Sequence, residues 1–366
     1  MSLKINKIIN GPIPDSFLFD ETKRLDSLKF DGQNLEVLDQ LLLPHEFKYI
    51  PILNVSDAFD VIKSMQVRGA PLIAVVGSLG LLLELQKMSE LNSDEIRKKI
   101  EFLISSRPTA VDLRNSLTGI LPILEKEGDS DGVKLEKCRE YLLEVYTSEK
   151  LQNRILVWNA YQELLAAFPD KKKLTVMTIC NTGSLATVSW GTALGVIRAL
   201  HSENRLELAY VLETRPYNQG IRLTATELIH GDVPFKLITD SMAAWAMKNH
   251  QVDCVLVGAD NVARNGDTAN KIGTYMLAVL AKHHNINFYP VVPFTTINKN
   301  IATGAEIKIE ERPSGELLRV NGVLVGHEKC PVWNPAFDVT PAELITKILT
   351  DFGNWSPELL EEQIPK

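Results

Sequence analysis

An apolar run that ends in a cysteine, Leu174-Thr-Val-Met-Thr-Ile-Cys180, is followed at once by a small polar turn, Asn181-Thr-Gly-Ser184. We expect a buried strand up to Cys180 and a helix of small residues that opens at this glycine. The backbone N–H groups and the dipole of a helix start attract anions, and the same field stabilises a thiolate. A second apolar run, Cys254-Val-Leu-Val-Gly-Ala-Asp260, ends in a carboxylate. Open α/β folds bind ligands at the carboxyl ends of their strands, so we expect Cys180 and Asp260 to meet there.

The second half of the chain repeats this alternation of strands and helices. Short apolar runs alternate with helical patterns, which is typical of βαβ units. The pattern predicts a doubly wound parallel sheet. The expected strands lie near residues 174–180, 208–214, 235–239, 254–259 and 288–293.

The first half of the chain has mainly helical patterns. Residues from Phe30 to Leu43 alternate around Asp31-Gly32, which predicts a β-hairpin. A helix follows, with Ser56-Asp57 as its expected N-cap. Further apolar residues recur at helical spacing, and they predict helices near residues 70–88, 93–105, 110–126 and 133–166.

The expected fold class is therefore α/β, in three consecutive segments. We expect residues 1–28 to form an N-terminal extension. Residues 29–166 should form a small α+β domain, mostly helical with a small antiparallel sheet, that ends in a long connecting helix. Residues 167–366 should form the Rossmann-like C-terminal domain. The length of 366 residues agrees with about two domains.

Composition narrows the classes of function. The formal net charge is −7, which argues against general binding to nucleic acid or to anionic membranes. The four cysteines form no C-x-x-C and no zinc-type spacing. This pattern favours reduced thiols, and therefore a cytoplasmic protein. The N-terminus lacks the apolar core of a signal peptide. The apolar run from Pro71 to Leu83 is too short to span a bilayer, so we expect it to be a core helix.

Two interpretations of Cys180 and Asp260 are possible from the sequence. A cysteine at a strand end is often a small buried apolar residue, and an aspartate after a buried strand often caps the next helix. The functional reading makes Cys180 and Asp260 an acid/base pair, with the pKa of Asp260 raised by apolar surroundings. Such a pair could divide the two proton transfers of an isomerisation.

Basic and polar residues at expected helix starts suggest an anion site. Arg68 precedes Gly69-Ala70-Pro71, with proline near the first helical position, and Arg107 repeats this arrangement. A guanidinium beside backbone N–H groups suits phosphate. Lys271 is expected in the first turn of a helix, against the dipole preference. The alternatives are two structural arginines and an exposed surface lysine.

The polar stretch from Glu213 to Gly220 follows an expected strand. It fits a loop that binds sugar hydroxyls, or else a simple polar turn. Asp240-Ser241 follows another expected strand, and a role as the N-cap of the next helix would explain these two residues. Several motifs are missing: G-x-G-x-x-G, the P-loop, H-E-x-x-H and G-x-S-x-G. The sequence therefore gives no sign of a nicotinamide site, a Walker-type nucleotide site or a serine hydrolase.

Many of these stretches together resemble the methylthioribose-1-phosphate isomerases of methionine salvage, a family related to the regulatory α, β and δ subunits of the translation factor 2B exchanger. The resemblance extends from about Leu35 to Gly353. Its blocks are Met65-Gln-Val-Arg-Gly-Ala-Pro71, Ser106-Arg-Pro-Thr-Ala-Val111, Cys180-Asn-Thr-Gly-Ser-Leu-Ala-Thr187, Glu213-Thr-Arg-Pro-Tyr-Asn-Gln-Gly220, Asp240-Ser-Met-Ala-Ala244, Gly258-Ala-Asp260, Asn265-Gly-Asp-Thr-Ala-Asn-Lys-Ile-Gly-Thr-Tyr275 and Asn334-Pro-Ala-Phe-Asp-Val-Thr-Pro341.

The resemblance implies conversion of 5-methylthioribose 1-phosphate to 5-methylthioribulose 1-phosphate, without cofactor or metal, by a cytoplasmic homodimer. Cys180 and Asp260 match the acid/base pair of the family. Seven further residues match positions that bind the phosphate and hydroxyls of the substrate: Arg68, Gly69, Ala70, Arg107, Gln219, Asn270 and Lys271.

Two other functions remain open from the sequence. A regulatory subunit of the exchange-factor-2B type would share the fold and bind a nucleotide or sugar phosphate, but it would not need Cys180 and Asp260 together. An isomerase of another ribose 1-phosphate derivative, such as ribose 1,5-bisphosphate, would use the same acid/base pair. An additional basic residue near C5 of the sugar would favour the bisphosphate.

Overall fold

A computed structural model describes residues 13–14, 17, 21–108 and 110–364. Backbone contacts divide the chain into two compact units. The N-terminal unit contains Leu25–Arg154 and Gly183–Gly191. The C-terminal unit contains Ile155–Thr182 and Thr192–Lys366, together with the described residues up to Arg24. The units therefore alternate along the chain, whereas the sequence suggested contiguous domains that meet after residue 166. Most of the expected extension, 1–28, lies outside the described residues.

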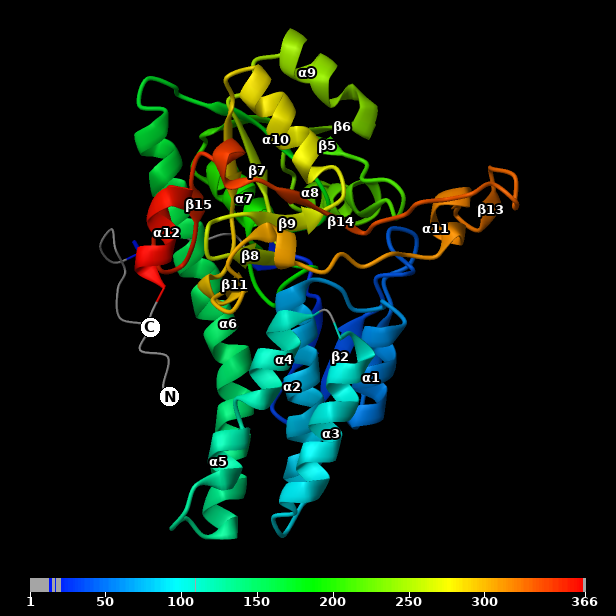
Figure 1. Cartoon of the computed structure of the whole chain (residues 1–366), viewed down its shortest axis with the longest axis vertical. Coiled ribbons are helices and arrows are strands. Elements are labelled where there is room, and N and C mark those ends of the chain that lie inside the picture. The colour runs from blue at the N-terminus through cyan, green and yellow to red at the C-terminus, as the bar shows by residue number, and fades with distance from the viewer. Residues whose placement is uncertain (1–12, 15–16, 18–20, 109, 365–366) are drawn as a thin grey trace. The chain divides into compact units, whose positions relative to one another are not determined.

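The N-terminal unit combines a small antiparallel sheet with a group of helices (Figure 1). The sheet has the order β1-β2-β3, and its first two strands confirm the predicted hairpin. Asp31 closes that hairpin, because its Oδ1 accepts the N–H groups of Gln33 and Asn34 at 2.9 and 2.7 Å. The elements are β1 Leu28–Phe30, β2 Leu35–Leu38, β3 Tyr49–Ile52, α1 Val55–Lys63, α2 Ala70–Lys87, α3 Ser93–Ser106, α4 Val111–Thr118, α5 Leu121–Glu125 and the first part of α6 Asp131–Ala167.

Helix α2 is the central helix of this unit, as the sequence predicted. It is apolar on all sides, which suits a helix surrounded by protein, and thirteen of its residues are buried. Over the described residues it alone is long and apolar enough to cross a membrane, but 72% of that window is buried inside the structure. It begins at Ala70 with Pro71 in its first turn, as expected.

Two local predictions in this unit were wrong. The N-cap of α1 is Asn54, whose side chain accepts the N–H of Asp57, rather than Ser56-Asp57. The helix expected over 110–126 is two helices, α4 and α5, which are separated near Gly119. A Cβ at Gly119 would lie 1.9 Å from the hydroxyl of Tyr141 on α6, so close packing against α6 requires glycine at this break.

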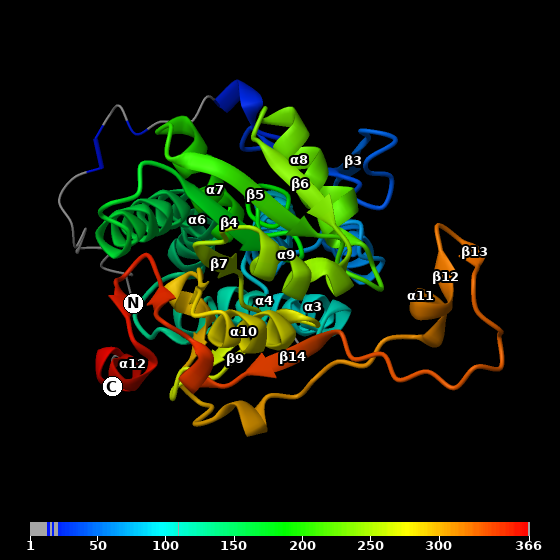
Figure 2. The ribbon, with the colours of Figure 1, turned by 90° about the horizontal axis from the view of Figure 1, so that it is seen from above.

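The C-terminal unit is built on a five-stranded parallel sheet with the order β10-β7-β4-β5-β6. In this order β4 is central, β5 and β6 are added on one side, and β7 and β10 on the other. The order of strand addition therefore reverses between β4 and β7, although all five strands run parallel. Figure 2 shows α7 on one face of the sheet and α10 on the other, with α9 beside α10. This is the doubly wound, Rossmann-like arrangement that the sequence predicted, and all five expected strands are present.

Buried apolar residues fix the packing of the helices on this sheet. Val255 and Val257 of β7 share one cluster with Met177 of β4, with Met247 of α9 and with Leu277 of α10. Alternate strand residues point to opposite faces, and the remaining apolar strand residues are buried as well. Both faces are therefore covered, as is typical of parallel sheets.

A second sheet and a projecting arm complete the C-terminal unit. The second sheet has the order β11-β8-β9-β14. The segment from α11 to β13 extends away from the parallel sheet in both views (Figures 1 and 2). The elements are β4 Leu174–Thr178, α7 Ala193–Ser202, β5 Leu206–Leu212, α8 Ala225–His230, β6 Phe235–Ile238, α9 Ala243–Asn249, β7 Cys254–Val257, β8 Asn261–Ala263, β9 Thr268–Lys271, α10 Thr274–His283, β10 Asn287–Pro290, β11 Ile297–Asn298, α11 Ser314–Leu318, β12 Arg319–Val320, β13 Val323–Leu324, β14 Phe337–Thr340, β15 Ile348–Leu349, β16 Asn354–Trp355 and α12 Pro357–Gln363.

Candidate active site

Cys180 follows β4 and Asp260 follows β7, the two neighbouring strands between which the order of strand addition reverses. Strands β4 and β7 pair in parallel, with Val176 opposite Cys254 and Met177 opposite Val255. Both strands therefore end at the same edge, and each is followed within three residues by its titratable side chain. Ligands of open α/β sheets bind at this reversal point, outside the carboxyl ends of the strands. The sheet thus brings Cys180 and Asp260 to one edge, as the sequence predicted.

Close packing around Gly258 joins the loops that carry these residues. A Cβ placed on Gly258 would lie 2.9 Å from the Cγ2 of Thr182 and 3.8 Å from the Oδ1 of Asn270. The loop after β4, the loop after β7 and Asn270 of β9 therefore come together at this glycine. Asn270 is 4% exposed, and its amide donates to the hydroxyl of Thr274 at 3.0 Å.

Asp260 does not cap a helix. The element after it is the strand β8, which pairs with β9 in an antiparallel hairpin, and the N–H of Asp260 donates to the carbonyl of Ala269 at 2.9 Å. The alternative that Asp260 is only the N-cap of a following helix is therefore excluded. Asp260 is a partly buried carboxylate in the bend between the parallel sheet and this hairpin.

The helix expected directly after Cys180 is absent, which corrects the sequence prediction. Residues 179–192 form an irregular loop, and α7 begins only at Ala193. The N–H of Leu194 is bound at 3.0 Å by the hydroxyl of Thr182, and the N–H of Thr192 by the carbonyl of Thr182 at 2.7 Å. The stabilisation of a Cys180 thiolate that we expected from a helix at Gly183 therefore has no helix to supply it.

The backbone of Cys180 has an unusual conformation that is held from both sides. Its φ of 67° lies in the left-handed region, which residues other than glycine seldom adopt. Its N–H donates to the hydroxyl of Thr214 at 2.8 Å, and its carbonyl accepts the hydroxyl of Thr224 at 2.5 Å. The side chain of the cysteine is partly buried.

The polar loop after β5 is fixed by a carboxylate from the short helix that follows β6. Asp240 accepts the N–H of Thr214 at 2.8 Å and the N–H of Arg215 at 2.7 Å. The N-cap of the short helix at 240–242 is Thr239, so the N-cap alternative for Asp240 is wrong. Arg215 also donates to the carbonyl of Leu317 at 2.7 Å, which connects this loop to the projecting arm.

Gln219 is the best-placed ligand-binding candidate in this loop. Its side chain is 2% exposed, and neither its amide nitrogen nor its amide oxygen has a hydrogen-bond partner in the described structure. A buried polar group without a partner costs free energy, so such a side chain suits a ligand that would satisfy it. The next residue, Gly220, packs against the end of β5, where a Cβ would lie 1.7 Å from the carbonyl oxygen of Leu212.

Lys271 lies on strand β9, not in the first turn of a helix as predicted; α10 begins at Thr274. Its ammonium donates to the carbonyl of Ala336 at 3.0 Å and lies 4.6 Å from the centre of the Phe337 ring. The argument from the helix dipole therefore does not apply to Lys271. Its cation is instead held over the neighbouring strand β14.

Asp338 of β14 caps α10 beside this lysine. Its carboxylate accepts the N–H of Gly273 at 2.7 Å and that of Tyr275 at 3.1 Å. Burial raises the pKa of Asp338 to about 6, and these two bonds and the charge of Lys271 oppose that rise. The start of α10 thus already holds a carboxylate of the protein.

Arg68, Gly69 and Ala70 belong to the N-terminal unit. Gly69 has a φ of 85°, and a Cβ there would lie 2.4 Å from the carbonyl oxygen of Ala186. The same oxygen accepts the N–H of Leu72 at 3.2 Å. Glycine is therefore required at this position both by conformation and by close contact. Arg68 is partly buried and directly precedes this turn.

Arg107 ends α3 in the same unit. It is the C-cap of that helix, and its carbonyl accepts the N–H of Ala110 at 3.0 Å just before α4. Helices α2 and α4 pack closely, because a Cβ at Gly77 would lie 2.5 Å from the Cδ1 of Leu113. The structure therefore gathers Arg68, Gly69, Ala70 and Arg107 in one unit, and Cys180, Gln219, Asp260, Asn270 and Lys271 in the other.

The segment from Gly183 to Gly191 is bound within the N-terminal unit. Glu149 of α6 accepts the N–H of Val188 at 3.3 Å, and Asn153 accepts that of Gly191 at 3.0 Å. Ser27 and Gln40 donate to the carbonyls of Thr187 and Leu185 at 2.6 and 2.7 Å. Burial raises the pKa of Glu149 to about 8.

The sequence did not reveal several residues whose side chains hold the site in place by hydrogen bonds. These residues are Thr214, Thr224, Glu227, Asp240 and Asp338. Thr214, Asp240 and Asp338 stand inside motifs that the sequence singled out, and their chemistry was not recognised there. Thr224 and Glu227 stand in no motif, and they lie 44 and 46 positions from the residues they bind. No local pattern could have identified them.

Comparisons with known proteins agree with this geometry. The model of the Initiation factor 2 subunit family matches residues 66–357. A methylthioribose-1-phosphate isomerase of Caenorhabditis elegans is 86% identical over 366 residues, which are 100% of both chains. These matches confirm the resemblance that the sequence motifs indicated.

Two solved structures extend the comparison. The 5-methylthioribose 1-phosphate isomerase of Pyrococcus horikoshii OT3 is 35% identical, with a TM-score of 0.84 over 97% of both chains. The translation initiation factor eIF-2B subunit delta of A. fulgidus is 36% identical, with a TM-score of 0.77 over 92% of this chain and 97% of that one. The expected α/β fold class is thereby confirmed.

Proposed function

We propose that this chain, which belongs to the Initiation factor 2 subunit family, is an aldose–ketose isomerase that converts 5-methylthioribose 1-phosphate to 5-methylthioribulose 1-phosphate. The observation that carries the proposal is the placement of Cys180 and Asp260 after the two strands that flank the reversal of the sheet. The identity of 86% to a protein named as this isomerase supports the choice of substrate. No cofactor and no metal enters the proposal.

The substrate sets a specific chemical difficulty. Phosphate on C1 occupies the anomeric oxygen, so the ring cannot open by itself. We assign Asp260 as the acid that protonates the ring oxygen while the bond between that oxygen and C1 breaks. Cys180, as thiolate, then takes the proton from C2, and its electron pair forms the C1–C2 double bond of an enol phosphate.

Product formation reverses the roles of the two groups. The carboxylate of Asp260 accepts the proton of the C2 hydroxyl, the ketone forms at C2, and the thiol of Cys180 returns its proton to C1. Each group thus ends in its initial protonation state. The apolar strand ends beside them, including buried Ile179 and Val257, exclude water from both transfers.

A hydride shift from C2 to C1 is the competing mechanism. In that route Cys180 acts on the proton of the C2 hydroxyl instead. Turnover in deuterated water distinguishes the two, because substantial deuterium at C1 of the product contradicts a hydride shift. Absence of label does not decide between them, since a shielded thiol can return the same proton.

We assign phosphate and hydroxyl binding to Arg68, Gly69, Ala70, Arg107, Gln219, Asn270 and Lys271. The N–H of Leu72 is already bound to Ala186, so anion binding at the start of α2 would rest on the Arg68 guanidinium and on the N–H groups of Gly69 and Ala70.

We further propose a cytoplasmic homodimer with no nucleic-acid or membrane partner. The net charge of −7 supports the last part of this assignment. Exposed apolar side chains support self-association: Leu237, Met242 and Trp245 of the C-terminal unit are 38%, 49% and 64% exposed. Light scattering of the purified protein measures the mass in solution, and a monomer at micromolar concentration would contradict the dimer.

A regulatory function without catalysis is the second candidate. The likeness to the A. fulgidus protein favours it. An acid and a thiol at the reversal of the sheet argue against it, because a binding module has no use for that pair. An isomerase of ribose 1,5-bisphosphate is a third candidate, and it uses the same two groups.

The test is turnover of 5-methylthioribose 1-phosphate without added metal or cofactor, with ketose formation followed for wild type, Cys180→Ser and Cys330→Ser. Cys330 is exposed and serves as the matched control. We expect turnover by wild type and Cys330→Ser, and a loss of at least 1000-fold in Cys180→Ser. Activity retained in Cys180→Ser would keep the isomerase and overturn the role of the thiol. Absence of turnover in wild type would direct the test to ribose 1,5-bisphosphate and then to the regulatory function.

A further inference from the structure

Within the C-terminal unit, a chain of buried polar contacts leads from the backbone of Cys180 to the helices α7 and α8. The amide of Asn181 donates to the Oε1 of Glu227 at 2.7 Å and to the hydroxyl of Thr224 at 3.3 Å. The same hydroxyl donates to the carbonyl of Cys180. Two residues of the segment after Gln219, Thr224 and Glu227, therefore hold both Cys180 and its neighbour.

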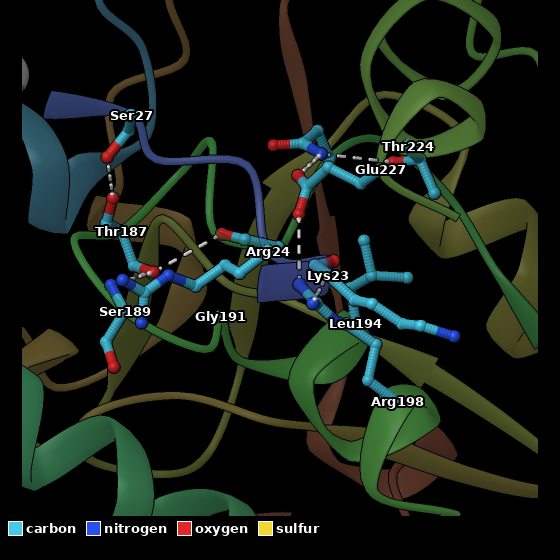
Figure 3. A network of polar contacts seen from close by, with 12 residues as sticks. Lys23, Arg24, Ser27, Thr187, Ser189, Gly191, Leu194, Arg198, Thr224 and Glu227 are labelled. Carbon is cyan, nitrogen blue, oxygen red and sulfur yellow. Dashed lines mark hydrogen bonds and ion pairs between the residues drawn. The ribbon is translucent and has the colours of Figure 1, made fainter. Parts of the chain in front are cut away.

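Glu227 is fixed by a buried arginine. Its side chain is fully buried, and its Oε2 lies 3.9 Å from the Nη1 of Arg198 on α7, which is 5% exposed. Figure 3 shows the carboxylate of Glu227 facing this guanidinium. Arg198 in turn donates through Nη2 to the carbonyl of Lys23 at 2.8 Å. A buried charge that has lost its partner is costly, so the arginine favours the buried position of Glu227.

On the other side of the cysteine, Thr214 is fixed equally well. Its hydroxyl accepts the N–H of Cys180 at 2.8 Å and donates to the carbonyl of Leu212 at 3.1 Å. Its own N–H is bound by Asp240 at 2.8 Å. Thr214 is fully buried and has a φ of 67°, the same left-handed value as Cys180.

Left-handed backbone at residues other than glycine is strained and persists only where the surroundings enforce it. The bonds to the N–H and to the carbonyl of Cys180 enforce it here. They fix the peptide planes on both sides of its Cα, and these planes set the direction in which Cβ and the thiol leave the chain.

We propose that Thr214, Thr224 and Glu227 are positioning residues that aim the thiol of Cys180 into the active site by holding its backbone in the left-handed conformation. This inference rests on the proposed function for its catalytic consequence, although not for its effect on the thiol. Thr214 acts on the N–H of the cysteine, Thr224 on its carbonyl, and Glu227 on the amide of the following asparagine.

The test uses Thr224→Val, which keeps the shape of the side chain and removes the hydroxyl. Thr226→Val is the matched control, because the hydroxyl of Thr226 binds the carbonyl of Arg222 at 2.6 Å in the same helical segment. All variants carry Cys330→Ser, so that alkylation reports on Cys180. The first readout is the rate of alkylation by iodoacetamide from pH 6 to pH 10, and the second is kcat and KM for 5-methylthioribose 1-phosphate.

We expect Thr224→Val to change the alkylation rate at least fivefold at a fixed pH and to lower kcat 10- to 100-fold, with KM within threefold of wild type. Thr224→Ser should restore both, and Thr226→Val should match wild type. If Thr224→Val is folded by circular dichroism and matches the control in both readouts, the inference is wrong.

Two further variants keep the test decisive if Thr224→Val does not fold. Thr214→Ser retains the hydroxyl and should behave as wild type, whereas Glu227→Gln removes the charge opposite Arg198 and should slow or speed alkylation at least threefold. A folded Glu227→Gln with an unchanged alkylation profile overturns the role of Glu227. Because alkylation needs no substrate, a protein that is inactive on 5-methylthioribose 1-phosphate but shows these changes refutes the proposed function alone.

Discussion

Gly258 lies against Thr182 so closely that any side chain at position 258 would meet the methyl group of the threonine at 2.9 Å. This contact joins the loop that follows Cys180 to the loop that leads to Asp260. A side chain at position 258 would therefore press these two loops apart.

Gly258→Ala tests this contact. The added methyl group must displace Thr182, and overpacking of this kind costs about 1–3 kcal/mol. We expect kcat to fall at least tenfold, because a small misplacement of reacting groups is costly. Gly315→Ala in α11 is the control, since nothing lies within 4 Å of its added Cβ. Equal kcat values for the two variants would contradict the prediction.

Gly69→Ala tests the contact between the arginine turn and Ala186. Gly69 and Gly32 both have positive φ values, of 85° and 104°, but a Cβ at Gly32 meets nothing within 4 Å. Positive φ alone should cost each alanine variant about 1–3 kcal/mol. We expect Gly69→Ala to lose about 1–3 kcal/mol more, because the obstacle is backbone. Urea unfolding of both variants measures the difference, and equal losses would show that the contact is unimportant.

Glu149→Gln tests the buried carboxyl that binds the segment from Gly183 to Gly191. The pKa of Glu149 is raised to about 8 by burial, so between about pH 4.5 and 8 the folded protein keeps a proton that the unfolded chain has released. The stability of the wild type therefore falls with rising pH across this window, by at most about 1.4 kcal/mol per pH unit from this group.

Glutamine does not titrate, so the stability of Glu149→Gln relative to wild type should increase from pH 5 to pH 8 and then level off. Urea unfolding of both proteins at matched pH values measures this difference, in which all other titrating groups cancel. A difference that stays constant with pH would mean that Glu149 is ionised throughout.

The four thiols should differ sharply in reactivity. Burial raises the pKa of Cys138 to about 11 and raises that of Cys254 further, and both side chains are buried. Cys330 is exposed and Cys180 is partly exposed. Only thiolates react with iodoacetamide, so mass spectrometry of the native protein should find label on Cys330 and Cys180 alone.

Activity should be lost in step with the label on Cys180 and not with the label on Cys330. Saturating 5-methylthioribose 1-phosphate should slow the labelling of Cys180 only. Label on Cys254 at native pH would contradict the burial argument, and full activity with Cys180 completely labelled would contradict its catalytic role.

The amino-acid sequence alone was enough to predict the parallel sheet, its five strands, the core helix α2 and the position of Cys180 and Asp260 at strand ends. Apolar periodicity is enough for these features, because alternation and run length follow directly from which faces are buried. The local sequence was misleading at Gly183 and at Lys271, where small and polar residues suggested that helices begin. Gly183 instead lies in a loop, and Lys271 lies on a strand.

The hydrogen bonds that hold Cys180 follow from the packing of the folded chain and could not be predicted. The hydroxyls of Thr214 and Thr224 come from segments 34 and 44 residues away, and the carboxylate of Glu227 is fixed by Arg198 on another helix. Hydrogen bonds between such distant residues depend on how the strands and helices pack. Periodicity reports which face of an element is buried, and it carries no information about which residue lies opposite.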